Sequence, residues 1–255
     1  MNVACSDGSP TARALRRAFP ESNATMFAHP EAALSALERR QVQRALLPVE
    51  SSTRGSVHRT YDLLLRHSSV HIVGELVQQM QLLHSRPAAV DDNGEEAAEY
   101  GRFWVLSRDA AVMPPARSEA EKETPASFKS TVAMVLREGL GGLHKALAAF
   151  AFRGITVSKV ESRPWRAQPL IAASSTPSSS HLMYFQYVLF IDIESSTASL
   201  ATRNALAQLQ EHASFLRLLG SYPCFHTSSA TLHTPSPPQP VLTHVLPMLQ
   251  LGAAC

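Results

Sequence analysis

Hydroxyl side chains gather in one short stretch of this sequence, directly after an apolar run. Residues 44–50 read R-A-L-L-P-V-E, which is typical of a buried strand. The loop that follows contains Ser52, Gly55 and Ser56, and a helical pattern that includes Thr60 comes next. Exposed N–H groups at the start of a helix, together with hydroxyls, suit a carboxylate ligand. The stretch is therefore a candidate anion site, and the alternative is a plain helix capped by Ser52 or Ser56.

A glycine pair, a helix and a strand with a charged end follow one another later in the sequence. Gly141 and Gly142 stand before Leu143, where apolar residues begin to recur at helical spacing. Gly154 is placed to end that helix in a left-handed conformation. The strand that follows ends in a polar cluster made of Glu161, Ser162, Arg163 and Pro164. The alternative interpretation of this cluster is a surface ion pair between its Glu and its Arg, which contributes little.

Composition excludes several classes of protein. The chain of 255 residues is long enough for one or two domains. Its 23 Lys and Arg against 21 Asp and Glu form no clustered basic face, so we expect no nucleic-acid partner. No apolar run approaches the length of a membrane span. The cysteines and histidines lack the spacing of a metal site, so we expect no metal and no cofactor, and Cys5, Cys224 and Cys255 are interpreted as free thiols.

Residues 48–64 and 141–164 resemble the prephenate and arogenate dehydratase family, of the plant or algal type with a C-terminal ACT domain. The first stretch follows the family pattern P-V-E-N-S-x-x-G-S-V-x-x-T-x-D-L-L, with Ser51 in place of the asparagine. His71 to Leu76, H-I-V-G-E-L, continues the resemblance. The resemblance implies an α/β chain in which a partial periplasmic-binding-protein-like lobe precedes a βαββαβ ferredoxin-like ACT domain. It breaks on both sides of residues 89–100, so we expect a truncated catalytic lobe.

The resemblance divides the chain into four segments. These are an incomplete catalytic domain (1–106), a linker (107–126), an ACT regulatory domain (127–223) and a disordered tail (224–255). Linker and tail are rich in proline and polar residues, which favours an irregular chain.

The resemblance also assigns roles to residues. The family motif T-R-F stands here as Gly101-Arg102-Phe103. In the family the threonine is the general acid that protonates the departing hydroxyl, and Gly101 has no proton to give. Arg102 remains as the catalytic candidate, with a surface charge on an edge strand as its alternative. The resemblance implies that Ser52, Ser56 and Thr60 bind the substrate carboxylate.

The implied activity is that of a carbon–oxygen lyase, a prephenate or arogenate dehydratase of phenylalanine biosynthesis, with little or no turnover expected from this chain. The implied effector is L-phenylalanine, bound between two subunits by Gly141, Gly142, Leu143 and the Glu161–Pro164 cluster. We expect a homodimer or homotetramer formed through the ACT domain, and no membrane partner. Two alternatives are a non-catalytic phenylalanine-binding regulatory protein and a sequence from which exons are missing. The resemblance places the protein in the plastid stroma, although the chain shows no transit peptide, and otherwise in the cytoplasm.

Overall fold

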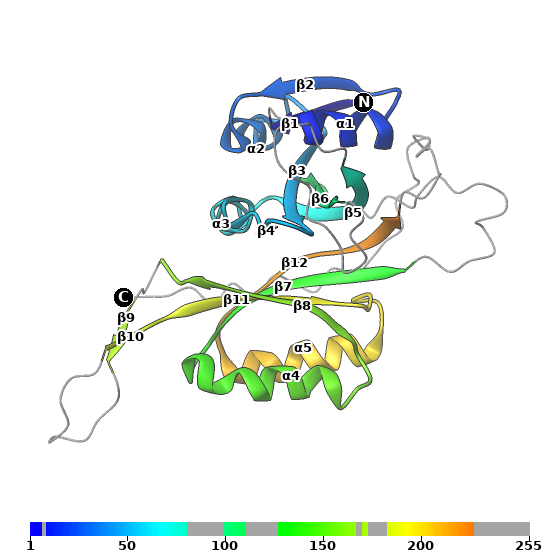
Figure 1. The fold of residues 1–255 in the computed structure, drawn as a ribbon. Coiled ribbons are helices and arrows are strands. Elements are labelled where there is room, and N and C mark those ends of the chain that lie inside the picture. Colours follow the sequence, from blue (N-terminus) through cyan, green and yellow to red (C-terminus); the bar gives the residue numbers. More distant parts are fainter. Residues whose placement is uncertain (7–8, 81–98, 111–126, 167–169, 173–182, 227–255) are drawn as a thin grey trace, which may run out of the picture. The chain divides into compact units, whose positions relative to one another are not determined.

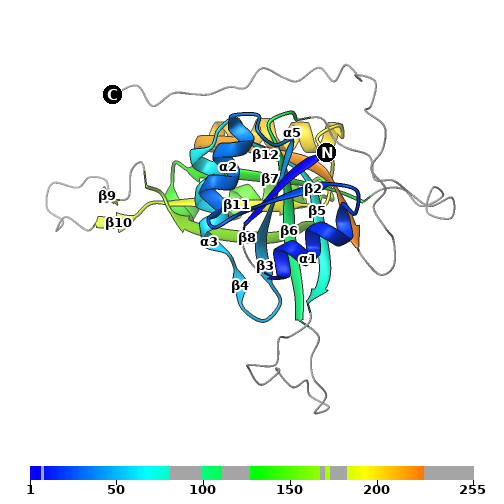
Figure 2. The same ribbon diagram turned by 90° about the horizontal axis from the view of Figure 1, so that it is seen from above.

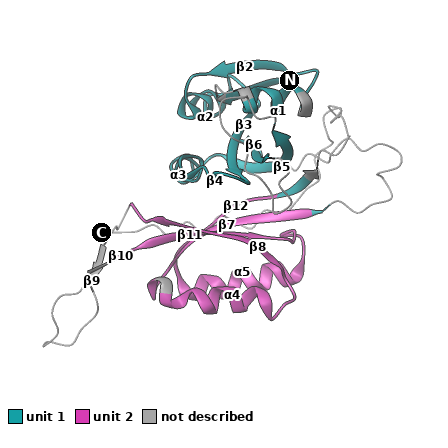
Figure 3. Cartoon of the chain, in the orientation of Figure 1, with its two compact units in different colours: residues 1–127, 222–240 teal, residues 128–221, 241–255 magenta. Residues whose placement is uncertain are grey.

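The computed structural model describes residues 1–6, 9–80, 99–110, 127–166, 170–172 and 183–226. These residues form two compact units (Figure 3). Unit 1 takes in Met1–Ser127 and the chain from Tyr222 onward in the last strand, and unit 2 takes in Phe128–Ser221. Each unit is a mixed α/β structure built on a sheet (Figure 1).

The sheet of unit 1 has the strand order β2-β1-β3-β6-β5-β12, and β4 pairs with β3. Its strands are β1 (Asn2–Ser6), β2 (Asn23–Phe27), β3 (Arg44–Ser51), β4 (Gly55–Ser56), β5 (His71–Met80), β6 (Glu99–Ser107) and the end of β12 (Ala213–His226). The strand β1 runs parallel to β2 and β3, whereas β6 runs antiparallel to both β3 and β5. Figure 2 shows β5 beside β6, and β4 folding back along the end of β3.

Three helices pack on this sheet: α1 (Ser9–Ala18), α2 (Pro30–Glu38) and α3 (His58–Arg66). On one face, Leu15 and Phe19 near α1 pack with Leu76 and Phe103 of the strands in one apolar cluster. Trp104, next to Phe103, points to the opposite face because side chains alternate along a strand. There its ring meets Tyr61 of α3, with ring centroids 5.2 Å apart.

The sheet of unit 2 has the strand order β12-β7-β11-β8. Its elements are β7 (Phe128–Leu136), the short 3₁₀ helix η2 (Gly139–Gly142), α4 (Leu143–Ala151), β8 (Val157–Pro164), β11 (Tyr187–Ile193), α5 (Leu200–His212) and β12. The helices α4 and α5 cover the same face of this sheet (Figure 1), where they bury Met134, Phe150 and Leu189. A separate two-stranded ladder joins β9 (Leu170–Ala172) to β10 (Met183–Phe185). No helix in the described part of the chain has the length and apolar character needed to cross a membrane.

The structure differs from the sequence-based segments at the end of the chain. Residues 224–226 were expected in a disordered tail, but they are the last residues of β12 and pair in parallel with Glu75, Leu76 and Val77. The backbone of Cys224 also donates to the carbonyl of Ser127 at 2.9 Å. Strand pairing therefore extends past the expected boundary at 223. Residues 111–126 of the expected linker and 227–255 of the expected tail lie outside the described residues.

Gly154 has the left-handed conformation expected from the sequence, with a φ of +64°. It follows α4, and its N–H donates to the carbonyl of Ala151 at 3.0 Å. An added Cβ would meet no atom within 4 Å, so only the backbone conformation disfavours a side chain there.

We therefore predict that Gly154→Ala lowers the free energy of unfolding by about 1–2 kcal/mol, the energetic penalty for an L-residue in this region. Urea denaturation of the purified protein measures the change. Gly141→Ala is the matched control, since it also has open space at its Cβ but no positive φ, and it should be close to neutral. Equal stability of the two variants would contradict the prediction.

Candidate active site

One row of paired residues crosses four neighbouring strands of unit 1. Glu50 of β3 is paired with Ser56 of β4 on one side and with Arg102 of β6 on the other. Arg102 is paired in turn with Val77 of β5. Directly opposed residues of antiparallel strands project from the same face of a sheet. The register therefore gathers Ser56 and Arg102, both expected site residues, around Glu50.

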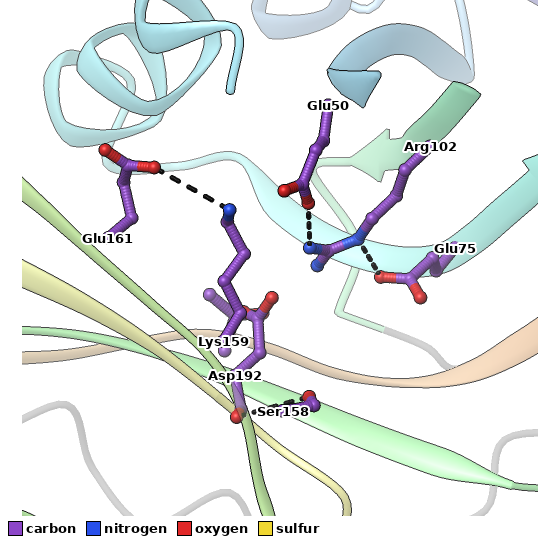
Figure 4. Close-up of polar contacts among 8 residues, drawn as sticks. Glu50, Glu75, Arg102, Ser158, Lys159, Glu161 and Asp192 are labelled. Atoms are coloured by element: carbon purple, nitrogen blue, oxygen red, sulfur yellow. Dashed lines mark hydrogen bonds and ion pairs between the residues drawn. The ribbon is translucent and has the colours of Figure 1, made fainter. Parts of the chain in front are cut away.

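Arg102 lies between two carboxylates (Figure 4). Its Nε donates to Oε2 of Glu75 at 2.6 Å, and a terminal nitrogen donates to Oε2 of Glu50 at 3.2 Å. The exposed fractions of the side chains are 12% for Arg102, 0% for Glu75 and 30% for Glu50. The alternative of a surface charge on an edge strand is wrong, because β6 is flanked by β3 and β5.

The Arg102 guanidinium lies over the ring of Trp104, which in turn packs against Tyr61. The central carbon of the Arg102 guanidinium lies 5.5 Å from the centroid of the Trp104 ring, a distance at which a cation is attracted to an indole. Trp104 is fully buried, and its indole nitrogen has no hydrogen-bond partner among the described residues. Tyr61 packs edge-on against the same ring.

The turn between β3 and β4 is organised by Ser51, the residue that departs from the family asparagine. Its Oγ donates to the buried carboxylate of Glu99 at 2.5 Å and accepts hydrogen bonds from the backbone N–H groups of Thr53 and Arg54. The Ser51 hydrogen bond lowers the pKa of Glu99, with smaller contributions from Thr53 and the Arg54 charge, and together these outweigh burial, which raises it. The short side chain of Ser51 thus holds the turn to β6.

The alternative interpretation, in which Ser52 or Ser56 caps helix α3, is wrong. The capping position is Val57, with no side-chain hydrogen bond, so neither Ser52 nor Ser56 caps the helix. Ser56 lies in β4 instead. No side chain at the capping position therefore takes up the N–H groups in the first turn of α3.

The other two hydroxyls of the predicted site, those of Ser52 and Thr60, form hydrogen bonds within unit 1. Ser52 is exposed, and its Oγ accepts a hydrogen bond from the backbone N–H of Tyr100 at 2.9 Å. Thr60 is buried, and its hydroxyl donates to the carbonyl of Pro48 at 2.6 Å. The Thr60 hydroxyl therefore fastens α3 to β3, while Ser52 joins the turn to β6.

The space beside Gly101 is filled. A Cβ added there would lie 2.7 Å from the sulfur of Met80 and 2.9 Å from a ring carbon of Phe103. Both distances are shorter than any real contact, so a side chain at this position requires Met80 to move. The thioether of Met80 thus occupies the place where the family resemblance expects the threonine.

In unit 2 the glycine turn lies at the start of α4. Gly142 is the buried capping residue of α4, and its φ of −81° is open to any residue. An added Cβ would make ordinary contacts of 3.5 Å with Glu138 and 3.6 Å with Leu136. Gly141 is exposed with open space at its Cβ, and Leu143, the first residue of α4, packs against the core.

The polar cluster in β8 alternates across the strand. Glu161 and Arg163 are half-buried, whereas Ser162 and Pro164 are exposed. Glu161 lies 3.7 Å from Nζ of Lys159 on the same strand (Figure 4). The ion pair between Glu161 and Arg163, the simpler interpretation of the sequence, stays a prediction.

The fold brings the glycine turn and the polar cluster to the same end of one sheet. Trp165, which directly follows the cluster, donates its N–H to the carbonyl of Gln186 at 2.7 Å. The side-chain amide of Gln186 donates to the carbonyl of Leu136, the last residue of β7 before the glycine turn, at 3.3 Å. Two motifs that are separated by a helix in the sequence therefore end beside each other, with β11 between their strands.

Glu50 and Glu75 were quoted in the family patterns but not recognised as site residues. The available signal was a carboxylate inside an apolar strand, since a buried charge requires a partner. Within the described ranges, no three His, Cys, Asp or Glu side chains converge as metal ligands.

Comparisons with known proteins place these features in a family. Residues 5–94 match the family model described as prephenate dehydratase. Arogenate dehydratase/prephenate dehydratase 2 of Arabidopsis thaliana, described as chloroplastic, is 34% identical over 275 residues, covering 85% of this chain and 70% of the relative. Arogenate dehydratase 2 of Petunia hybrida is 33% identical over 276 residues, covering 85% of this chain and 69% of that relative. The 275 aligned positions exceed the 255 residues of this chain, so the Arabidopsis relative contains segments without a counterpart here.

Solved structures of prephenate dehydratases share the fold of this chain. The X-ray structure of prephenate dehydratase from Streptococcus mutans has a TM-score of 0.63 and 26% sequence identity, covering 89% of this chain and 99% of that chain. A prephenate dehydratase from Arthrobacter aurescens in complex with L-Phe has a TM-score of 0.62 at 19% identity, covering 87% and 89%, and supports the fold alone. With relatives above 30% identity of which it covers more than two thirds, the chain belongs to the arogenate/prephenate dehydratase family.

Proposed function

We propose that this protein serves the dehydratase step of L-phenylalanine biosynthesis, as a carbon–oxygen lyase acting on prephenate or arogenate. In that reaction the ring loses carbon dioxide and a hydroxyl group, which gives phenylpyruvate from prephenate or phenylalanine from arogenate. The observation that supports this proposal is the row of Ser56, Glu50 and Arg102 beside the uncapped start of α3. A cation and helical N–H groups together suit the carboxylates that both substrates carry. Family membership supplies the reaction.

The proposal includes a finer description of the fold. Unit 1 corresponds to one periplasmic-binding-protein-like lobe of the catalytic domain. Unit 2 corresponds to the ACT domain, because the element order β7-α4-β8-β11-α5-β12 and the sheet order β12-β7-β11-β8 fit a ferredoxin-like βαββαβ fold. The chloroplastic relatives support a place of action in the plastid.

A second candidate function, a non-catalytic phenylalanine-binding regulator, is favoured by the geometry at Gly101. The family acid is absent there, and Met80 fills its place. General acid catalysis typically contributes ~10²–10⁴-fold to a rate. The two functions therefore differ in whether any turnover remains.

We predict that the purified chain converts prephenate or arogenate at a rate roughly 10²–10⁴-fold below that of a relative with the threonine, assayed alongside. Product formation followed by chromatography measures this rate. Turnover equal to that of the relative would contradict the prediction, and turnover that cannot be detected at all would favour the regulator.

Gly101→Thr alone should leave the rate low, since its Cβ would collide with the Met80 sulfur. The double variant Met80→Ala/Gly101→Thr removes the contact with Met80, leaves the Phe103 ring 2.9 Å from the added Cβ, and is the matched comparison. It should still stay below the relative, because the segments absent from this chain contribute positioning as well.

We further propose that L-phenylalanine binds unit 2 as an effector. Gly141 and Gly142 would let the backbone approach the amino-acid moiety, Leu143 would receive the ring, and the Glu161–Pro164 cluster would close the site. The shared sheet end of the glycine turn and the cluster supports this arrangement.

We predict that millimolar phenylalanine gives saturable heat in calorimetry and raises the melting temperature by mass action. Gly142→Val should remove both effects, since its added methyl groups extend toward the space that the ligand needs. Gly142→Ala is the structural control, because a Cβ makes only ordinary contacts there. Binding that survives in Gly142→Val, or is absent from the wild type, would show that the assignment is wrong.

We also propose that the protein forms a homodimer or homotetramer through unit 2. The strand β8 lies at the end of the sheet order, and Val160 on it is 41% exposed. An open strand edge with an apolar side chain favours pairing with another chain.

Light scattering at micromolar concentration should therefore give at least twice the mass of one chain. Val160→Lys should shift the distribution toward monomer, because a charge on an edge strand opposes pairing. A wild-type protein that is monomeric throughout this range would overturn the proposed assembly.

A further inference from the structure

Two carboxylates share one guanidinium in unit 1, and they differ sharply in burial. Glu75 is fully buried and lies 2.6 Å from Nε of Arg102. Glu50 is 30% exposed and lies 3.2 Å from a terminal nitrogen of the same side chain. The shorter contact thus belongs to the buried partner, and the longer contact to the accessible one.

The buried contact is of the kind that fixes geometry. A carboxylate removed from water is strongly destabilised unless a cation stays beside it, so Glu75 and Arg102 depend on each other. Nε lies nearest the aliphatic stem of the arginine, so a bond at this atom sets the direction of the whole planar group. The Trp104 ring, 5.5 Å from the guanidinium carbon, restricts it further.

The contact between Arg102 and the partly exposed Glu50 is of the kind that another carboxylate can replace. Glu50 is partly open to water, which competes for its charge and weakens its ion pair relative to the buried one. A terminal nitrogen of arginine is also the group that binds the carboxylates of ligands. Glu50 therefore places a carboxylate of the protein where a carboxylate of the substrate would bind.

We propose that Glu75 is a positioning residue that fixes Arg102 for substrate binding, and that Glu50 is an internal competitor that the substrate carboxylate replaces on Arg102. The inference rests on the proposed function, since it requires a substrate that carries a carboxylate. It assigns opposite effects on affinity to two residues of the same type and charge.

Opposite signs separate this proposal from a simple effect of charge. Removing either carboxylate makes the surroundings of Arg102 more positive, so electrostatics alone would tighten the binding of an anion in both variants. Under the proposal, only the loss of Glu50 tightens binding, because the loss of Glu75 releases the guanidinium from its fixed direction.

The experiment titrates the full-length protein with prephenate and with arogenate by calorimetry. The variants are Glu50→Gln, Glu75→Ala and Glu75→Gln. Glu38→Gln is the matched control, since it removes a glutamate contact of 2.9 Å to His67, at the opposite end of α3 from the proposed site. The chain has two tryptophans, so a Trp165→Phe background leaves Trp104 as the only reporter of guanidinium movement in fluorescence.

We expect Glu50→Gln to lower the dissociation constant roughly two- to fivefold, the equivalent of a released exposed ion pair. Glu75→Ala should raise it about tenfold or more and shift the Trp104 emission, because a displaced binding group loses alignment with its ligand. Glu75→Gln keeps an oxygen that accepts from Nε–H and should rescue part of the affinity. Glu38→Gln should bind as the wild type does.

Tighter binding in both Glu50→Gln and Glu75→Ala would overturn the proposal, as would unchanged affinity in Glu50→Gln. Binding of neither probe by the wild type at millimolar concentration would overturn it too. If Glu75→Ala does not fold, Glu75→Gln decides, because affinity above that of the wild type in this variant contradicts a positioning role. If the dissociation constants of Glu50→Gln and Glu75→Ala shift in opposite directions but the protein shows no turnover, only the proposed function is wrong. If both shift in the same direction and the protein shows turnover, only this inference is wrong.

Discussion

The buried ion pair between Glu75 and Arg102 is the constraint around which unit 1 is arranged. Neither charge tolerates burial alone, so β5 and β6 must lie side by side in a register that lets the two side chains meet. The same register sets Trp104 opposite Glu75, and Trp104 gives α3 its contact through Tyr61. The position of a helix and the position of the candidate catalytic cation are thus consequences of one pairing. Loss of Arg102 would leave the Glu75 carboxylate buried without this ion pair.

Local patterns in the sequence predicted the elements that depend on local chemistry. The apolar run at 44–50 is a buried strand, and Gly154 has its left-handed conformation, because strand burial and glycine freedom are both expressed in neighbouring residues. The alternative of a helix capped by Ser52 or Ser56 failed for a tertiary reason. Ser56 is drawn into a short strand paired with Glu50, so α3 starts one residue after Val57 without a side-chain cap.

The environment of Arg102 could not be predicted from the sequence, because its partners lie 27 and 52 residues away along the chain. The strands β10 and β11 are likewise separated by Gln186, whose backbone and side chain bond to Trp165 and Leu136. These bonds draw together two motifs whose proximity the resemblance implied but the spacing alone could not show. In each case a contact between distant residues decided what local propensity had left open.

The strand β12 belongs to both units, because its first residues complete the sheet of unit 2 and its last residues pair with β5 in unit 1. A gene that ended at the sequence boundary between the units would encode a first unit without its outermost strand. The exposed edge of β5 would then carry unpaired backbone groups beside the buried Glu75, a condition that promotes aggregation. The sheet of unit 1 is therefore completed by residues that follow unit 2 in the sequence.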